Sequence, residues 1–225
     1  CMVTHHTIVV SKYLQRFVAK RYHRRACYIP NAVSLSERVK PALITRFGLT
    51  TGNYILSVSR LVKHKGIHTL IESYLQLSQK RPNLPFLVIV GGSVFTDGYV
   101  ESLKEMAKGN DRILFLGEQY GEMLHELYSN TRLFIQSSQT EGLSYSLLEA
   151  MSFGAPVLVS DIAENKEVLS TVGHTFRTGD SDDLTHNIES LLFSGRKESW
   201  VTNRDYVKTH YNLDMAMGKI LGFYT

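Results

Sequence analysis

Short, continuously apolar segments alternate with amphipathic ones along most of this chain, and this rhythm limits its fold more than any other feature. The clearest apolar run is Phe86 to Val90, and the clearest amphipathic segment is Gly66 to Lys80. Strands that are apolar at every position are typical of a parallel sheet with helices on both faces. The sequence therefore predicts an α/β fold with a Rossmann-like sheet. The other strands are predicted at residues 7–11, 53–59, 112–116, 133–135, 156–160 and 175–176.

Composition excludes several other classes of protein. The chain has 225 residues, of which 43% are hydrophobic and 20% charged, so neither a disordered chain nor a coiled coil is expected. No apolar run approaches the roughly 18 residues of a membrane span. Two cysteines and no recognisable secretory signal favour a reducing, cytoplasmic location. A domain boundary is predicted near residues 26–34, between a small leading piece and one compact domain.

The net charge of +4 is unevenly distributed, because residues 1–25 carry six Lys or Arg side chains and no acid. Contact with anionic lipid or with nucleic acid is one interpretation of this cluster. A solvated helix face is the other, and we favour it because the aromatic side chains of a base-stacking surface are not interleaved with the charges.

The first candidate site follows the strand at residues 53–59. Arg60 and Lys65 lie five positions apart in a loop that opens a helix at Gly66. Arginine binds phosphate oxygens bidentately, lysine adds a point charge, and a helix N-terminus offers free N–H groups. This pattern suits a diphosphate. A basic turn exposed to solvent is the alternative.

The second candidate site follows the strand at residues 133–135. Glu141 and Glu149 are carboxylates that can accept hydrogen bonds from sugar hydroxyls, and Gly142 allows close approach of the backbone to a ligand. Ser146 and Glu149 also have the spacing of a capping box, in which Glu149 would only cap its own helix. On spacing alone, the cap is the favoured interpretation of Glu149.

No metal site is predicted. The nine histidines have no ligand spacing next to cysteines or carboxylates, and we identify no Asp-x-Asp pair of the kind that holds a metal on a diphosphate. Asp182 and Asp183 are assigned to a helix start. Gly91-Gly92 and Gly117-Glu118 close two strands and are unspecific by themselves, and the first lacks the full dinucleotide-binding fingerprint.

Taken together, these motifs resemble the C-terminal donor-binding domain of the retaining family 4 (group 1) glycosyltransferases. Residues 57–60, followed by Lys65-Gly66, resemble the segment that holds the donor diphosphate. Residues 141–149 resemble the family's E-x7-E signature, and residues 154–157 resemble the G-x-P-V strand after it. The resemblance covers about residues 27–195 and implies the C-terminal half of a GT-B fold.

The resemblance also implies a role for each motif. Glu141 would contact the transferred sugar, while Arg60 and Lys65 would stabilise the departing diphosphate. Glu149 would hold the ribose, and Gly117 and Glu118 would lie near the base. The amides of Gly142, Leu143 and Ser144 would lie near the sugar and phosphate, although the family often has glycine in place of Ser144.

The implied reaction transfers a hexosyl-type sugar from a UDP- or GDP-linked donor, with retained anomeric configuration and without a metal or other cofactor, in polysaccharide or glycolipid biosynthesis. Residues 1–26 would be the tail end of an N-terminal acceptor domain, residues 27–195 the donor-binding domain, and residues 196–225 C-terminal helices. Without the acceptor domain, we expect weak donor binding and little or no turnover. A lipid acceptor would allow peripheral contact between the basic leading helix and an anionic membrane.

Three alternatives remain open from the sequence. A nucleotide-sugar 2-epimerase of related fold would need acid and base groups that we do not locate. A non-catalytic nucleotide-sugar binding module would keep the same residues. A nucleic-acid binder driven by the basic leading segment is less favoured, and its affinity would depend steeply on salt. We expect no nucleic-acid partner.

Overall fold

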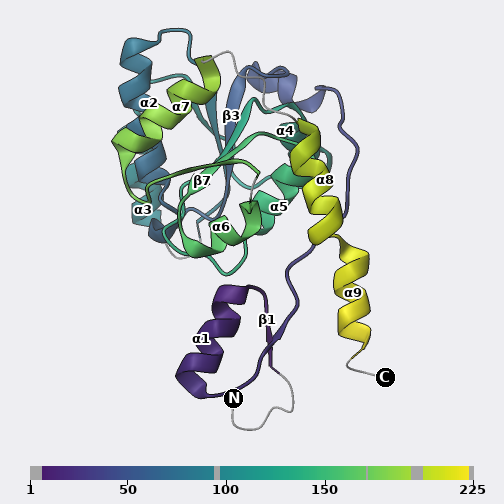
Figure 1. Cartoon of the computed structure of the whole chain (residues 1–225). Helices are drawn as coiled ribbons and strands as arrows, with labels where there is room; N and C mark the ends of the chain where they lie inside the picture. Colours follow the sequence, from purple (N-terminus) through teal and green to yellow (C-terminus); the bar gives the residue numbers. More distant parts are fainter. Residues whose placement is uncertain (1–6, 94–96, 171, 194–199, 223–225) are drawn as a thin grey trace.

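The computed structural model describes residues 7–93, 97–170, 172–193 and 200–222 (Figure 1). Its main element is a six-stranded, fully parallel sheet with the strand order β5-β4-β3-β6-β7-β8. This order is that of a Rossmann fold, so the predicted fold class is confirmed. The strands are β3 (Tyr54–Val58), β4 (Phe86–Val90), β5 (Ile113–Phe115), β6 (Leu133–Gln136), β7 (Val157–Ser160) and β8 (His174–Phe176).

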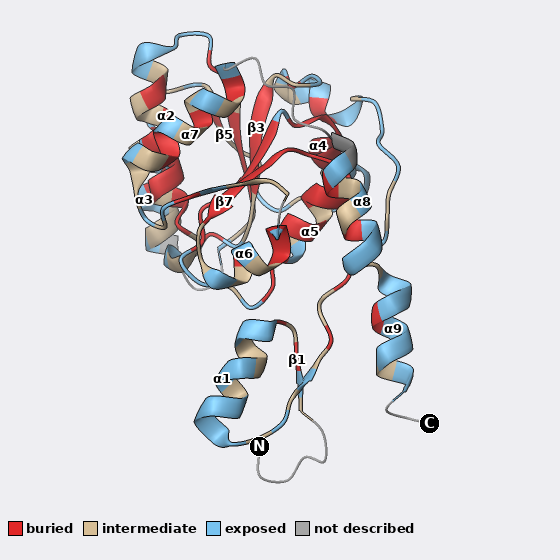
Figure 2. Ribbon diagram, viewed as in Figure 1, coloured by how far each residue is buried: buried red, intermediate tan, exposed pale blue. Residues whose placement is uncertain are grey.

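Both faces of the sheet are buried, which explains why its strands are apolar at successive positions (Figure 2). In β3, Leu56 packs into the cluster on one face and Ile55 into the cluster on the other. In β6, Phe134 and Ile135 divide in the same way. Side chains alternate between the two faces of a strand, so each face needs its own cover of helices.

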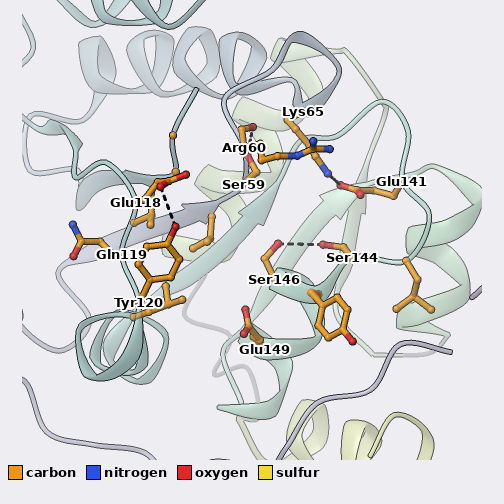
Figure 3. A pocket seen from close by; sticks show the side chains of 17 residues that line it. Ser59, Arg60, Lys65, Glu118, Gln119, Tyr120, Glu141, Ser144, Ser146 and Glu149 are labelled. Carbon is orange, nitrogen blue, oxygen red and sulfur yellow. Dashed lines mark hydrogen bonds and ion pairs between the residues drawn. The ribbon is translucent and has the colours of Figure 1, made fainter. Parts of the chain in front are cut away.

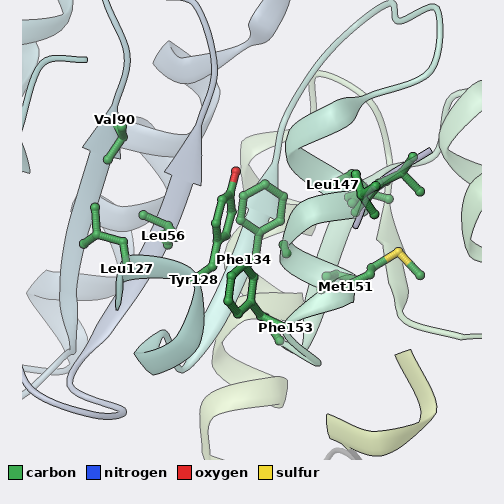
Figure 4. Close-up of a cluster of buried hydrophobic side chains, with 14 of the residues drawn as sticks. Leu56, Val90, Leu127, Tyr128, Phe134, Leu147, Met151 and Phe153 are labelled. Atoms are coloured by element: carbon green, nitrogen blue, oxygen red, sulfur yellow. The ribbon is translucent and has the colours of Figure 1, made fainter. Parts of the chain in front are cut away.

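Among the residues that the structure describes, three helices cover one face of the sheet and four cover the other. The first group contributes Leu70, Leu103 and Ile188 to its cluster and comprises α2 (Ile67–Lys80), α3 (Asp97–Ala107) and α7 (Ser181–Phe193). The second group buries the hydrophobic cluster drawn in Figure 4, which includes the aromatic side chains of Tyr128 and Phe153. It comprises α4 (Gly121–Asn130), α5 (Tyr145–Ser152), α6 (Ala163–Leu169) and α8 (Trp200–His210), with the 3-10 helix η1 (Leu43–Phe47) beside α4.

A second, smaller unit lies apart from this sheet (Figure 1). It comprises β1 (Ile8–Val9), α1 (Lys12–Tyr22) and β2 (Cys27–Tyr28), and its two strands pair in parallel. We call it the leading unit. Helix α1 has no buried residue. Its first turn is held by the main domain, because Lys12 N and Tyr13 N donate to the Glu167 carboxylate of α6 at 2.8 and 3.2 Å.

The chain returns toward the leading unit at its other end. Helix α9 (Leu213–Leu221) packs Ala216 against Ile29 and Ala32, in the segment that follows β2. Residues at both ends of the sequence therefore share one small apolar cluster. Within the described ranges, no helix is both long and apolar enough to cross a bilayer.

Candidate functional site

A cleft opens at the carboxyl edge of the sheet, where the strand order reverses. From β3 the chain continues to β4 on one side, whereas from β6 it continues to β7 on the other. The loops after β3 and β6 therefore diverge, and ligands of such sheets bind at this point. The cleft has a volume of about 450 Å³ and is walled by residues that follow β3, β4, β5 and β6 (Figure 3). This volume lies within the range of small-molecule sites.

The sequence-predicted residues converge here from the loops after three strands, β3, β5 and β6, and from helix α5. Arg60 and Lys65 come from the loop after β3, and Glu141 from the loop after β6. Gly117 and Gly142 are not among the lining residues, and Gly142 instead faces Val10 of the leading unit. The other predicted residues that line the cleft are Glu118, Leu143, Ser144 and Glu149.

Lys65 and Glu141 form a nearly buried ion pair inside the cleft. Lys65 Nζ lies 2.5 Å from Glu141 Oε1, and the two side chains are only 13% and 8% exposed. Arg60 is exposed and has no ion-pair partner among the residues that the structure describes. Among the described residues that line the cleft, Lys65 and Glu141 neutralise each other, and Arg60 is a cation that is free to bind an anion.

Gly66 is what brings these two loops together. Its φ is +66°, and a Cβ placed on it would come within 2.1 Å of the Ser137 carbonyl oxygen at the end of β6. Only glycine combines this left-handed conformation with so close an approach of two backbones. Ser137 Oγ also donates to the Lys65 carbonyl at 3.0 Å, which fixes Lys65 against the loop that carries Glu141.

The first turn of α2 does not face the cleft as the sequence analysis expected. The helix begins at Gly66, but neither this residue nor Ile67 is among the lining residues. The amide of His68 is already engaged, because it donates to the Tyr99 hydroxyl of α3 at 3.4 Å. Anion binding at this end of the cleft therefore depends on the Arg60 and Lys65 side chains.

The first turn of α5 lines the cleft instead. Ser144 is the N-cap, and its hydroxyl accepts a hydrogen bond from Leu147 N at 3.3 Å. The predicted capping box is therefore wrong, because the helix begins two residues earlier than Ser146 would require. Tyr145 and Ser146, at the first two helical positions, line the cleft. An N-terminus in this position favours negative charge in a ligand.

Glu149 points into the cleft from α5, and its side chain caps no helix among the described residues. Its Oε2 accepts a hydrogen bond from the buried Tyr128 hydroxyl at 3.0 Å. Burial raises the pKa of the Glu149 carboxyl, while the hydrogen bond from Tyr128 and the nearby His125 partly offset this effect. The carboxylate is half-buried, so it can accept hydrogen bonds from a ligand with little competition from water.

A buried polar chain beneath Glu141 was missed by the sequence analysis. Gln136 Nε2, at the end of β6, lies 3.3 Å from Glu141 Oε1 and 3.0 Å from Asn165 Oδ1. Asn165 in turn donates to the Ser160 carbonyl at 3.0 Å. Gln136 and Asn165 are 4% and 1% exposed. The one available signal was a glutamine at the end of an otherwise apolar strand.

The segment after β2 also reaches this site, through a contact that sequence spacing could not reveal. Asn31 Nδ2 donates to the Leu143 carbonyl at 2.8 Å. This bond ties the segment after β2 to the loop that carries Glu141. The loop is thus held from below by Gln136 and from the side by Asn31.

The aspartates near residue 180 have a local structural role. An Asp-x-Asp spacing does occur, at Asp180-Ser181-Asp182, which corrects the sequence analysis. Asp180 Oδ1 accepts from Asp183 N at 2.9 Å at the start of α7, so Asp180 acts as the cap. None of these residues lines the cleft. Across the described residues, no three His, Cys, Asp or Glu side chains group as metal ligands, and metal independence stays a prediction.

Comparison with known proteins identifies the family. The model of the family described as glycosyl transferases group 1 matches residues 41–204, and the chain belongs to this family. The O-antigen chain mannosyltransferase RfbU of Salmonella typhimurium is 31% identical over 171 residues, which cover 73% of this chain and 44% of the relative. The alpha-galactosylglucosyldiacylglycerol synthase of Streptococcus pneumoniae is 29% identical over a match that covers 73% of this chain and 46% of the relative. The chain thus spans less than half the length of these relatives.

Solved structures share the fold. HepE of Anabaena, solved in complex with UDP and glucose, superposes with a TM-score of 0.86 at 21% identity. The match covers 97% of this chain and 62% of the HepE chain. Sucrose-phosphate synthase of Thermosynechococcus elongatus superposes with a TM-score of 0.81 at 22% identity. That match covers 96% of this chain and 57% of the synthase chain. These neighbours are GT-B glycosyltransferases, so the predicted GT-B relationship is confirmed.

Proposed function

We propose that this chain supplies the nucleotide-sugar donor site of a retaining glycosyltransferase of polysaccharide or glycolipid biosynthesis. The observation that carries the proposal is the composition of one cleft. A free guanidinium, a lysine–glutamate pair and the first turn of α5 surround the same space at the strand-order reversal. These groups suit a ligand that joins a diphosphate to a polyol.

The diphosphate would bind at Arg60 and beside Lys65. The Lys65 ammonium has three donors, and its bond to Glu141 uses only one of them. During transfer, the bond between the anomeric carbon and the phosphate oxygen breaks, and negative charge grows on the diphosphate. Cationic groups that are already in place stabilise this charge without reorganisation, which lowers the barrier.

The sugar would lie against Glu141. Its Oε1 is engaged by Lys65 and Gln136, whereas no hydrogen bond from the described residues reaches Oε2. That oxygen is available to accept from a sugar hydroxyl. Glu149, held by Tyr128, would accept from the ribose hydroxyls. The acceptor would lose its proton to the donor phosphate on the same face of the sugar, which retains the anomeric configuration and requires no metal.

A second domain outside this chain would hold the acceptor. Large apolar side chains stay exposed on the leading unit and on α9, among them Phe17 at 46% and Leu221 at 56%. Such surfaces suit a further protein layer. The isolated chain would then bind donor weakly and transfer little. Co-expression with a complementing N-terminal domain and analysis of the product's anomeric configuration would test retention.

Localisation at the cytoplasmic face of a membrane is also part of the proposal. Contrary to the sequence analysis, aromatic side chains are interleaved with the charges: Arg16 and Lys20 on α1 lie next to the exposed Phe17. Anionic lipid attracts such segments. Sedimentation with vesicles rich in phosphatidylglycerol, compared with neutral vesicles, checks this expectation.

The donor site is tested by titration calorimetry of the full chain with nucleoside diphosphates, in buffer containing excess chelator. We expect one site per chain, with affinity reduced at least tenfold in Arg60→Ala, because a hydrogen-bonded charge contact to phosphate is lost. Arg46→Ala, in η1 and outside the cleft, is the matched control and should leave binding unchanged. Binding that is insensitive to Arg60→Ala would contradict the assigned phosphate position.

A further inference from the structure

Glu118 places a third carboxylate in the cleft, in addition to Glu141 and Glu149, at the end away from the groups proposed to bind phosphate. We propose that Glu118 selects guanine, so that the donor of this enzyme is a GDP-linked sugar. This inference rests on the proposed function and adds the identity of the base. Four observations support it: the order of the loops along the cleft, the rigidity of its floor, the restraint on Glu118 and the pattern of donors on each base.

The order of loops along the cleft follows from the order of the strands. Neighbouring strands are about 4.8 Å apart, so the turn after β5 lies roughly 14 Å from the loop after β6. Arg60 and Glu141 follow the central strands β3 and β6, whereas Glu118 follows β5 (Figure 3). A diphosphate sugar held at the central strands therefore extends its base toward Glu118. The charge of Glu118 also repels phosphate from that end.

The floor between these two ends consists of closely packed backbone and is firmly held. A Cβ on Gly91 would come within 1.8 Å of the Ser59 carbonyl oxygen, so no side chain can stand at this position. Gly91 N donates to the Gly117 carbonyl at 2.8 Å, and Leu61 N donates to the Gly92 carbonyl at 2.9 Å. The turns after β3, β4 and β5 are thereby joined by backbone hydrogen bonds. Such a rigid floor gives a bound base a fixed surface to lie on.

The Glu118 carboxylate is held above that floor from two sides. The Tyr120 hydroxyl donates to Glu118 Oε2 at 3.0 Å. Glu118 Oε1 occupies the space next to Gly92, only 2.6 Å from where a Cβ would stand. Glu118, Tyr120 and both glycines line the cleft. The carboxylate is therefore restrained beside the space that the base would occupy, although it is exposed to solvent in the absence of a ligand.

The bases differ in what they can offer a carboxylate. Guanine has two adjacent donors, N1–H and the N2 amino group, which match two carboxylate oxygens. Uracil has a single N–H between two carbonyl oxygens, and these are repelled by a carboxylate. Adenine and cytosine each pair one amino donor with a ring nitrogen that accepts. An ionised carboxylate can only accept hydrogen bonds, and bidentate charged hydrogen bonds are the strongest. Glu118 should therefore bind guanine more tightly than the other bases.

Calorimetric competition among GDP, IDP, UDP and ADP on the full chain tests this ranking. We expect GDP to bind at least tenfold more tightly than UDP or ADP, because hydrogen bonds to charged groups are the stronger ones. IDP lacks the N2 amino group and should fall between GDP and UDP. Arg60→Ala should weaken all four nucleotides by a similar factor, since phosphate is common to them.

Two variants separate the charge of Glu118 from its position. Glu118→Gln keeps the shape and should reduce the preference for GDP over UDP to threefold or less. Gly92→Ala keeps the charge, but its methyl group takes the space of the carboxylate and should reduce the preference in the same direction. Glu122→Gln removes an exposed carboxylate in the first turn of α4, outside the cleft, and should leave the ranking unchanged.

The outcomes are distinguishable. A GDP preference that Glu118→Gln abolishes supports the inference. Tight binding of UDP or ADP that remains sensitive to Arg60→Ala overturns the inference and leaves the donor site intact. A GDP preference that survives both Glu118→Gln and Gly92→Ala also overturns it. Failure of every nucleotide to bind a folded sample overturns the inference together with the donor site.

Discussion

The six-stranded sheet with its covering helices, which we call the sheet domain, differs from the leading unit in how much apolar surface it buries. In the sheet domain, Phe134 is fully buried between the strands and α4 and α5. In the leading unit, Phe17 of α1 is 46% exposed, and the helix has no buried residue. The sheet domain is stabilised by its own core, whereas the leading unit is held by a few polar contacts. A two-stranded sheet with one uncovered helix is marginal on its own, so the leading unit depends on other surfaces.

Matched phenylalanine substitutions test this difference with the largest expected effect. Phe134→Ala should lower the free energy of unfolding by about 3–5 kcal/mol, because it opens a cavity in the core. Phe17→Ala should change it by about 0.5 kcal/mol or less, as for a surface position. Urea denaturation followed by circular dichroism measures both. Equal losses would mean that α1 is part of the same cooperative core.

Glycine substitutions test how the sheet domain assembles its site. Gly66→Ala should lower the free energy of unfolding by about 3 kcal/mol or more, because it combines a left-handed backbone with a steric clash at the Ser137 carbonyl. Gly48→Ala has a similar φ of +70° but open space around it, so about 1 kcal/mol is expected from the backbone alone. Thermal unfolding of the two variants isolates the clash. A Gly48→Ala cost as large as that of Gly66→Ala would remove the argument for close loop contact.

The polar contact between the two units should have a smaller, local effect. Glu167→Gln removes the negative charge that accepts from Lys12 N and Tyr13 N, and about 1 kcal/mol of local stability should be lost from α1. Amide hydrogen exchange in α1 should then accelerate about fivefold, with exchange in the sheet strands unchanged. Glu101→Gln, on the exposed face of α3, is the control for loss of a carboxylate. Unchanged exchange in α1 would show that this contact does not hold it.

The smallest expected effect concerns the pH dependence of stability at Glu149. Its folded-state pKa is raised above the ordinary value of 4.5, chiefly by burial. The folded protein therefore binds this proton more tightly than the unfolded chain, and the associated stability is lost as pH rises from 4.5 through the raised pKa. Glu149→Gln should remove this loss, so that the variant gains stability relative to the parent chain over that interval. Denaturation curves at pH 4 to 7 check the sign. If Glu149→Gln instead gained stability relative to the parent chain as pH falls, the raised pKa would be contradicted.

Much of the sheet domain could be predicted because its determinants are local. Phe86 to Val90 is a strand with the predicted limits, since an apolar run bounded by proline and glycine permits little else. The cleft could be predicted as well, because polar residues after parallel strands gather at one edge of the sheet. The start of α5 could not, since Ser144 and Ser146 both have the chemistry of a cap, and tertiary contacts decide between them.

The contacts that hold the site residues in place could not be predicted from sequence spacing, for a physical reason. Asn31 and Leu143 are 112 positions apart, and Gln136 meets Asn165 across 29 positions. No periodicity encodes such contacts, because they depend on how whole elements pack. The partnership of Lys65 with Glu141, 76 positions apart, was likewise hidden, although both residues were singled out individually.

The central claim, that a nucleoside diphosphate binds in the cleft at the strand-order reversal, is tested most directly by amide NMR. Labelled chain would be titrated with GDP and with inorganic phosphate, with excess chelator present. We predict that GDP shifts the amides of residues 59–65, 91–92, 118–120 and 141–149, while phosphate shifts only those near Arg60 and Lys65. Shifts confined to the leading unit or to α9, or none at saturating GDP in a folded sample, would contradict the account.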